Sequence, residues 1–524
     1  MDIKIKIFVL LALVVIVMVY FSSNLKMLLK IDEGMPVVYS CHANLYEMMF
    51  KNKPKVIARP IADMTFVSSA SNSIARVMNG NRTRRLSVGD TLLVEVKMRD
   101  FARRPKHHGG DFLLTRLSNV RLGAAASGTV TDHGDGTYLV AFRISWPGES
   151  HAEVVLVHSS KAVAALERVR EAVPDKIGFW GSFVSGRREE RSACHVSLNA
   201  TAGGRLCDFG DAERGEAWRC ARPRGMPCSA LRGYVSYTKY ARMFTSEECQ
   251  LFSRLTIAFR GTGAPQEMPL KTCLPGLGTP RPSGFYLQGV WRSTVCSARS
   301  FDTPAKVTDC LRHREVYLFG DSTIRQYMEY LETFVTALKR VDFYKSGRHQ
   351  PKLAIDARNN ITLAWFCHAY PLVTASYTLK EDVQHIARRI DGMSGGSRVA
   401  VGISLGAHFT PFPLEVFRTR MRNIGGAVRR LLRRSPETRV IVKLANTRDA
   451  DNLEIFNNWS TFRVNEITLD AFRGADVAFV DAWDMTASVN SAQIHPSKAI
   501  TLASIGAPAR GAAAERGSAA AAFF

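Results

Sequence analysis

The apolar residues of the first third of the chain follow a pattern typical of short β-strands. From about residue 61 to 165, short apolar runs are separated by turn-forming clusters such as Asp132-His133-Gly134-Asp135-Gly136. Strands at this spacing predict an all-β sandwich, with Trp146 as a core residue. The predicted strands are 64–67, 91–96, 138–142 and 154–158.

From about residue 314 the pattern changes to continuous Val/Ile/Leu runs that alternate with segments of helical spacing. Such an alternation predicts an α/β domain, in which a mainly parallel sheet is covered by helices on both faces. Strands are expected at 316–319, 361–366, 398–405, 440–444 and 477–480, and helices at 323–340, 414–434 and 462–472.

The N-terminus carries one long apolar run, the nineteen uncharged residues from Ile7 to Leu25. This is barely long enough to span a bilayer, and no small-x-small cleavage site follows it. We therefore expect a signal anchor over 1–26 and a stem over 27–60, with the rest of the chain in the lumen. A cleaved signal peptide is the alternative. The expected location is the secretory pathway, either as a single-pass Golgi membrane protein or, after cleavage, as a secreted one.

Cysteines and glycosylation triplets agree with that location. Most of the 10 cysteines lie between 194 and 310, and none forms a C-x-x-C pair. Disulfides are thus expected, a metal site is not, and residues 191–285 are interpreted as a loop-rich, disulfide-held connector. Four N-x-[ST] triplets are candidate glycosylation sites, at Asn81, Asn199, Asn360 and Asn458.

The chain is strongly basic, with 70 Lys+Arg against 47 Asp+Glu and a formal net charge of +23. A basic surface favours an acidic partner, which is a nucleic acid, an anionic glycan or an anionic lipid. No nucleic-acid recognition motif accompanies the arginines, so a nucleic-acid partner is not expected. A glycan or glycoprotein is the expected partner, together with the membrane through the N-terminal segment.

Candidate chemistry lies where the predicted parallel strands end, in the loops 320–323, 406–410 and 481–496. Ser322 lies between a strand and a helix, where its hydroxyl is accessible and helix N–H groups can stabilise an oxyanion. A serine nucleophile needs a base, and His495 in the last loop can supply one. Taken alone, Ser322 is better explained as an ordinary helix cap and His495 as a surface histidine, and only their joint placement favours catalysis.

The Gly320-Asp321-Ser322 triplet in this context resembles the nucleophile block of SGNH/GDSL hydrolases. The longer string YLFGDSTIRQYMEYL (317–331) resembles the PC-esterase domain of the neurexophilin and PC-esterase (NXPE) family, and the resemblance covers about residues 60–497. Further motifs similar to that family are ISLGAHFTPFP (403–413), KLANTRD (443–449), VDAWDMT (480–486), FVSSASNS (66–73), GGDFLLTRL (109–117), SGTVTDHGDGTYLVAF (127–142) and RPRGMPCSAL (222–231).

The resemblance implies both an architecture and an activity. The architecture is a neurexophilin-like, immunoglobulin-like β-sandwich at 61–190 and an SGNH-like three-layer α/β domain at 286–500. The activity is transfer or hydrolysis of O-acyl groups, above all O-acetyl groups, on glycans such as sialic acids through a serine acyl-enzyme. No bound cofactor is implied, and acetyl-CoA would be a co-substrate.

The resemblance also assigns roles to residues. Ser322 is the implied nucleophile and His495 the base, while Ser322, Gly406 and His408 are candidates for the oxyanion hole. Asp321 is expected to interact with the helix dipole, and Arg325 with either an acidic sugar or a neighbouring carboxylate.

Two departures from the family pattern open an alternative. Many SGNH enzymes orient the histidine with an Asp three residues earlier, but that position is Ala492 here, which leaves Asp481 and Asp484 as substitutes. Residues 501–524 form an atypical Ala/Gly-rich tail, which we expect to weaken closure of the domain. The alternative is a catalytically inactive, neurexophilin-like glycoprotein that binds a cell-surface receptor.

Overall fold

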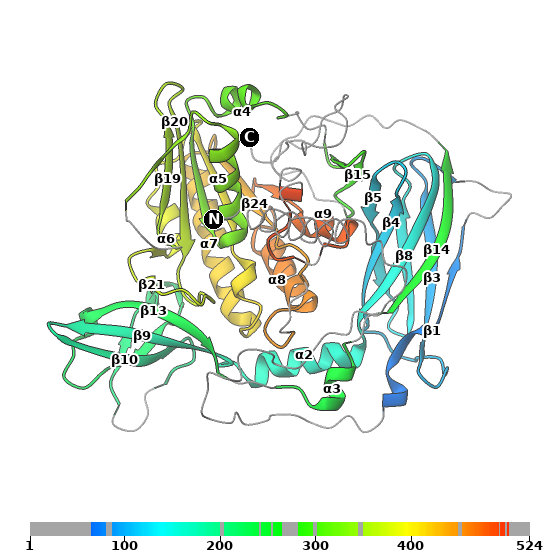
Figure 1. Ribbon diagram of the computed structural model, residues 1–524, viewed down its shortest axis with the longest axis horizontal. Coiled ribbons are helices and arrows are strands. Elements are labelled where there is room, and N and C mark those ends of the chain that lie inside the picture. Colours follow the sequence, from blue (N-terminus) through cyan, green and yellow to red (C-terminus); the bar gives the residue numbers. More distant parts are fainter. Residues whose placement is uncertain are drawn as a thin grey trace, which may run out of the picture. The chain divides into compact units, whose positions relative to one another are not determined.

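The computed structural model describes residues 64–79, 86–199, 204–239, 243–252, 255–264, 281–296, 301–343, 349–448, 453–491, 493–497 and 500–501. The predicted anchor, stem and atypical tail, apart from Thr501, lie outside these residues. No helix among the described residues has the length and apolarity needed to cross a membrane. The described chain is mixed α/β, with a β-rich N-terminal part and several antiparallel sheets (Figure 1).

The N-terminal part contains two sheets that share one apolar core, as the alternating pattern predicts. Val94, Phe142 and Trp146 are buried between them, and the Trp146 indole donates to Ser150 Oγ. Segment 64–67 was expected to be a strand, but Met64–Phe66 forms a turn of 3-10 helix (η2). The smaller sheet has the order β1 (Ser68–Val77), β3 (Thr91–Asp100), β7 (Thr137–Arg143) and β6 (Thr129–Asp132).

The larger sheet corrects the expected domain boundaries. It takes its last strands from residues 255–293, although most of that segment was expected to lie in the connector. Strand β14 pairs antiparallel with β8, about 100 residues earlier in the chain. A local sequence pattern does not predict pairing between strands so far apart. The order is β16 (Val290–Ser293), β15 (Gly284–Leu287), β5 (Ala124–Ser127), β4 (Phe112–Asn119), β8 (Gly148–His158), β14 (Leu255–Ala264) and β2 (Leu86–Ser87).

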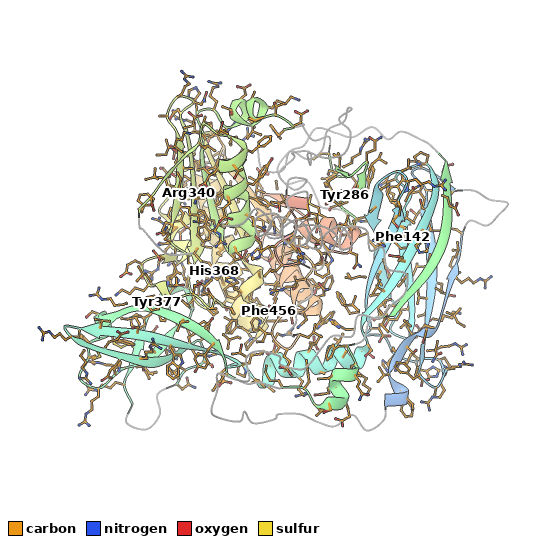
Figure 2. The ribbon with its side chains drawn as sticks, viewed as in Figure 1. Phe142, Tyr286, Arg340, His368, Tyr377 and Phe456 are labelled. Atoms are coloured by element: carbon orange, nitrogen blue, oxygen red, sulfur yellow. A yellow bond between two sulfur atoms is a disulfide. The ribbon has the colours of Figure 1, made fainter. Side chains whose placement is uncertain are left out.

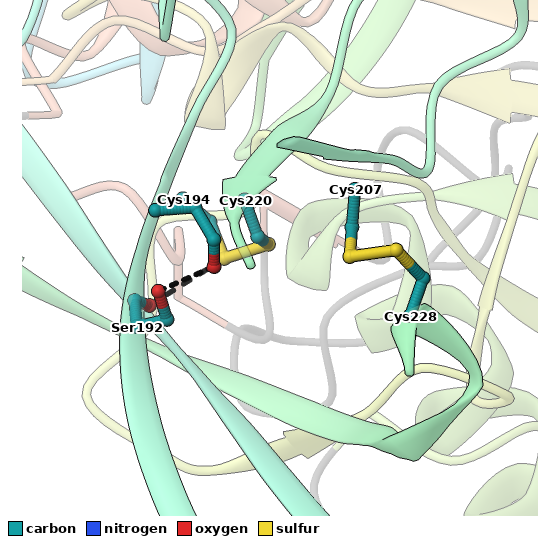
Figure 3. Close-up of a disulfide and its surroundings, with 6 residues drawn as sticks. Ser192, Cys194, Cys207, Cys220 and Cys228 are labelled. Atoms are coloured by element: carbon teal, nitrogen blue, oxygen red, sulfur yellow. Dashed lines mark hydrogen bonds between the residues drawn. A yellow bond between two sulfur atoms is a disulfide. The ribbon is translucent and has the colours of Figure 1, made fainter. Parts of the chain in front are cut away.

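Much of the expected connector is also a sheet, which begins before residue 190. Two disulfides hold it, Cys194–Cys220 and Cys207–Cys228 (Figure 3). The order is β11 (Leu206–Asp208), β12 (Arg219–Ala221), β10 (Arg188–His195), β9 (Ile177–Ser185), β13 (Leu231–Thr238) and β21 (Thr378–Leu379). Helices α2 (Ser160–Ala172) and α3 (Ser246–Gln250) flank this segment along the chain.

The C-terminal part contains an eight-stranded sheet with a parallel centre. Its five strands β20, β17, β23, β24 and β25 pair in parallel, and β22 adds to β20 in the same direction. The antiparallel edge of β18 and β19 was not predicted. The strands are β18 (Lys339–Val341), β19 (Lys352–Asp356), β20 (Ile361–His368), β17 (Glu315–Gly320), β23 (Val399–Ser404), β24 (Arg439–Lys443), β25 (Ala478–Val480) and β22 (Val383–Gln384).

Helices cover both faces of this sheet (Figure 1). Val316 and Leu318 pack with helix α5 on one face, whereas Phe319 shares the other core with α6, α7 and α8. Helix α5 ends at Phe334 rather than near 340, because Val335 leaves the helix and is buried. The helices are α4 (Pro304–Leu311), α5 (Ser322–Phe334), α6 (Ile386–Asp391), η5 (Gly406–His408), α7 (Leu414–Arg434), α8 (Asn458–Ala471) and α9 (Ala482–Ser488).

Candidate active site

Ser322 lies at a corner whose geometry requires a glycine. Gly320 ends β17 with φ +145°, and a Cβ at this position would lie 1.6 Å from the carbonyl oxygen of Ser404 on the neighbouring strand. The N–H of Asp321 donates to the same carbonyl at 2.9 Å. The chain can therefore turn at once into α5, with Ser322 as its first residue and the Ser322 N–H free of any intrahelical acceptor.

The structure brings the two residues expected to carry the chemistry together. His495 Nε2 lies 2.7 Å from Ser322 Oγ, although 173 positions separate them in sequence. Desolvation lowers the pKa of His495; Asp321 opposes this shift, and Arg325 and Arg448 add to it. A neutral imidazole that accepts the serine proton is the arrangement that general-base activation requires.

Asp481 and Asp484 do not orient His495. The Asp484 carboxylate accepts from Ser127 Oγ at 2.9 Å and from the N–H of Ser283 at 2.6 Å, and Asp481 caps α9 by accepting from the Asp484 N–H. No hydrogen bond or ion pair joins His495 to a carboxylate within the residues that the structure describes. The expected substitutes for the missing aspartate are thus engaged elsewhere.

Asp321 ties the nucleophile corner to the second candidate loop. Its Oδ1 accepts from the N–H of Thr323 at 2.8 Å and from the Thr323 hydroxyl at 2.7 Å, so Asp321, and not Ser322, is the N-cap of α5. Its Oδ2 accepts from the N–H of Ala407 at 3.1 Å. The carboxylate is 1% exposed, so it fixes residues 406–408 beside the serine rather than contacting solvent.

His408 belongs to a buried pair whose hydrogen bonds define its tautomer. The Ala369 carbonyl can only accept, so His368 donates to it through Nδ1, at 2.8 Å. Burial lowers the pKa of His368 and takes that of His408 to about 3, so both rings are neutral. His408 Nδ1 must then donate to His368 Nε2 at 3.1 Å. His408 Nε2 consequently carries a lone pair, which argues against His408 as an oxyanion donor and leaves the backbone of Ser322 and Gly406.

Two arginines contribute positive charge near the serine. Arg325 donates to Glu329 at 2.9 Å, which is the carboxylate pairing that was one of its two expected roles. Arg448 is 5% exposed, donates to the Ala407 carbonyl at 3.0 Å and lies 3.9 Å from the centre of the Phe456 ring. Phe456 and His368 are labelled in Figure 2.

Sequence reasoning assigned no role to the 443–448 segment. Three residues at the end of strand β24 contact the loops of the site. Lys443 is the last residue of this strand, and Asn446 and Arg448 follow it. The rule that active sites form beyond the carboxyl ends of parallel strands would have found them, because the KLANTRD motif begins at such an end.

The candidate glycosylation sites differ in accessibility. Asn199 and Asn360 are exposed, whereas Asn81 lies outside the described residues. Asn458 is 2% exposed and its side chain accepts from the N–H of Arg448 at 2.8 Å, so glycosylation there is incompatible with this fold. Among the described residues, no group of three or more His, Cys, Asp or Glu is placed to hold a metal ion.

Two family models match the chain, and together they cover more than half of it. The model described as "NXPE family member 4-like, C-terminal domain" matches residues 291–506, and the model described as "Neurexophilin" matches residues 59–250. Among solved structures, that of invasin, a bacterial integrin-binding protein, aligns with 64% of this chain and 67% of its own. Its identity is 10% and its TM-score 0.14, so this likeness carries no argument.

Proposed function

The chain belongs to the NXPE family, and from this premise we propose that it is an O-acyltransferase or esterase that acts on glycans through a serine acyl-enzyme. The family and the disulfides indicate a protein of the secretory pathway. The single observation that carries the proposal is the 2.7 Å contact between Ser322 Oγ and His495 Nε2 at the carboxyl edge of the sheet. The parallel centre of that sheet supports an SGNH-like domain.

In the first half-reaction, His495 Nε2 takes the proton of the Ser322 hydroxyl while Oγ attacks the acyl carbonyl of the donor. We assign stabilisation of the developing oxyanion to the N–H of Ser322, at the first position of α5, and to the N–H of Gly406. The imidazolium then returns its proton to the leaving group, and an acyl-serine remains. Because the pKa of His495 is lowered, the imidazole is ready to act as a base at neutral pH.

In the second half-reaction, the same imidazole deprotonates the acceptor, which is a sugar hydroxyl for a transferase and water for an esterase. The acceptor oxygen attacks the acyl carbonyl, the bond to Ser322 Oγ breaks, and the imidazolium returns its proton to Oγ. The chain carries a formal net charge of +23, and a basic protein favours an acceptor with a carboxylate, which suits a sialic acid. Acetyl-CoA is the proposed acyl donor and a Golgi membrane, reached through the N-terminal segment, the proposed location.

The test uses the glycosylated full chain with acetyl-CoA and a sialylated glycan, and follows acetate on the sugar by mass spectrometry. Ser322→Ala is expected to abolish the product, and a fluorophosphonate probe is expected to label wild type but not this variant. Product formation that persists in Ser322→Ala would exclude the proposed role.

One observation favours a second candidate, the receptor-binding glycoprotein without catalysis. Within the described residues, no carboxylate orients His495, and a serine–histidine pair without an orienting group is a weaker catalyst. Failure of the fluorophosphonate probe to label a folded, glycosylated chain would support this candidate.

A further inference from the structure

No carboxylate orients the His495 imidazole within the described structure. The backbone of the loop 493–497 is instead held by a side-chain amide. The residue before it, Ile494, has a carbonyl that accepts from Asn446 Nδ2 at 3.0 Å. Asn446 is 5% exposed, and a buried side-chain amide with both ends bonded has little freedom to move. This hydrogen bond therefore holds the backbone from which the imidazole projects.

Lys443 fixes the orientation of that amide. Its Nζ lies 2.9 Å from Asn446 Oδ1, and an ammonium can only donate. The oxygen of the amide must then face Lys443, and its NH2 group must face the Ile494 carbonyl. The two contacts agree on one orientation of Asn446, so they reinforce each other.

Lys443 also connects this amide to the nucleophile side of the site. It is 4% exposed, ends β24, donates to the Leu444 carbonyl at 3.1 Å and lies 3.4 Å from Thr323 Oγ1. The Thr323 hydroxyl donates to Asp321. Polar contacts thus run from Asp321, which precedes Ser322, to Ile494, which precedes His495.

We infer that Asn446 is a positioning residue that sets the distance between His495 and Ser322, and that Lys443 is its anchor. The inference rests on the proposed function, because it assigns to a neutral amide the orienting task that an aspartate performs in many serine–histidine sites.

The test is Asn446→Asp, which keeps the oxygen that faces Lys443 but replaces the NH2 donor by an oxygen that repels the Ile494 carbonyl. The matched control is Asn457→Asp, which loses one amide hydrogen bond to a carbonyl, that of Leu453, in an equally buried side chain. Two properties are measured: turnover of a small acyl ester, and hydrogen–deuterium exchange of residues 493–497.

For Asn446→Asp we expect kcat to fall about 10- to 100-fold with KM within about twofold, because a displaced base loses much of its contribution. Exchange of 493–497 is expected to accelerate in this variant and in Lys443→Met, but not in Asn457→Asp. Identical exchange in Asn446→Asp and Asn457→Asp would overturn the inference. A further outcome is a wild type that turns over no ester while exchange is still faster only in the Asn446 and Lys443 variants. That result would support the positioning role of Asn446 and reject the proposed function.

Discussion

At the scale of single residues, the site depends on the protonation of one imidazole. A base must be neutral to accept the serine proton, and desolvation lowers the pKa of His495 from its ordinary value of 6.5. The rate is therefore expected to be constant at neutral pH and to fall only when the pH drops through a value below 6.5. The measurement is kcat/KM for a small acyl ester between about pH 4 and pH 8.

Protonation of His408 will not contribute to this fall in kcat/KM, since the pKa of His408 is about 3. A fall in kcat/KM that begins clearly above pH 6.5 would contradict the environment described for His495. Circular dichroism of the wild type over the same pH range serves as a control for general effects of acid on the fold.

Substitution of Gly320 is expected to be the most harmful to the turn between strand β17 and helix α5, which carries Ser322. Gly320→Ala would place a Cβ 1.6 Å from a backbone oxygen, so two paired strands would have to separate. We expect a loss of at least about 3 kcal/mol in the free energy of unfolding, together with loss of activity. Denaturant unfolding followed by circular dichroism measures it.

Gly186→Ala is the matched control, because Gly186 also has positive φ but nothing within 4 Å of an added Cβ. Its cost is backbone strain alone, about 1–2 kcal/mol. Equal losses for the two variants would show that the close approach to Ser404 is unimportant.

At the scale of elements, the residue that caps helix α9, Asp481, has a buried carboxyl group that makes stability depend on pH. Burial, with the neighbouring Asp484, raises the pKa of Asp481 to about 7 from 3.8. The folded state then binds a proton that the unfolded state has released. The resulting stabilisation is present in full below about pH 4 and is lost as the pH rises through about 7.

Asp481→Asn should remove this dependence. The wild type is expected to lose roughly 2–4 kcal/mol from this group between pH 4 and pH 7, and the variant is not. Urea unfolding at several pH values measures the difference. Asp309→Asn, at a position whose side chain is 70% exposed, should behave as wild type. Parallel pH curves for wild type and Asp481→Asn would contradict the assignment.

The elements also show what a sequence pattern can and cannot predict. Helix 414–434 was placed to the residue, because its apolar positions recur at helical spacing and face one core. Strand 361–366 was placed nearly as well, since it is a continuous apolar run inside the sheet. The six-stranded sheet, five of whose strands lie over 177–238, was missed because glycines and arginines interrupt its strands and because its last strand, β21, comes from residues 378–379.

The same distinction applies to the site. Ser322 and His495 could be predicted because each follows a recognisable strand and carries a chemically distinctive side chain. The tether of Asn446 to Ile494 could not, since it depends on a single amide orientation that three-dimensional contacts define.

At the scale of the whole molecule, the sandwich and the α/β part are joined by specific contacts. Phe112 of β4 is 7% exposed and packs against Trp459 and Phe462 of α8, with ring centroids 5.4 and 5.6 Å apart. Asp484 of α9 accepts from Ser127 of β5. Cutting the chain at 286 would leave these aromatic rings and this carboxylate without their partners.

We therefore expect the two parts to unfold together. Phe112→Ala should lower the free energy of unfolding by about 3 kcal/mol, because it leaves a cavity between them. Hydrogen–deuterium exchange should accelerate equally in β3 of the sandwich and in β23 of the parallel sheet. Phe101→Ala, at a ring that is 46% exposed, is the control and should change neither strand. If exchange in β23 stayed at the wild-type rate while β3 accelerated, the contacts at Phe112 would hold the sandwich alone and the α/β part would be an independent folding unit.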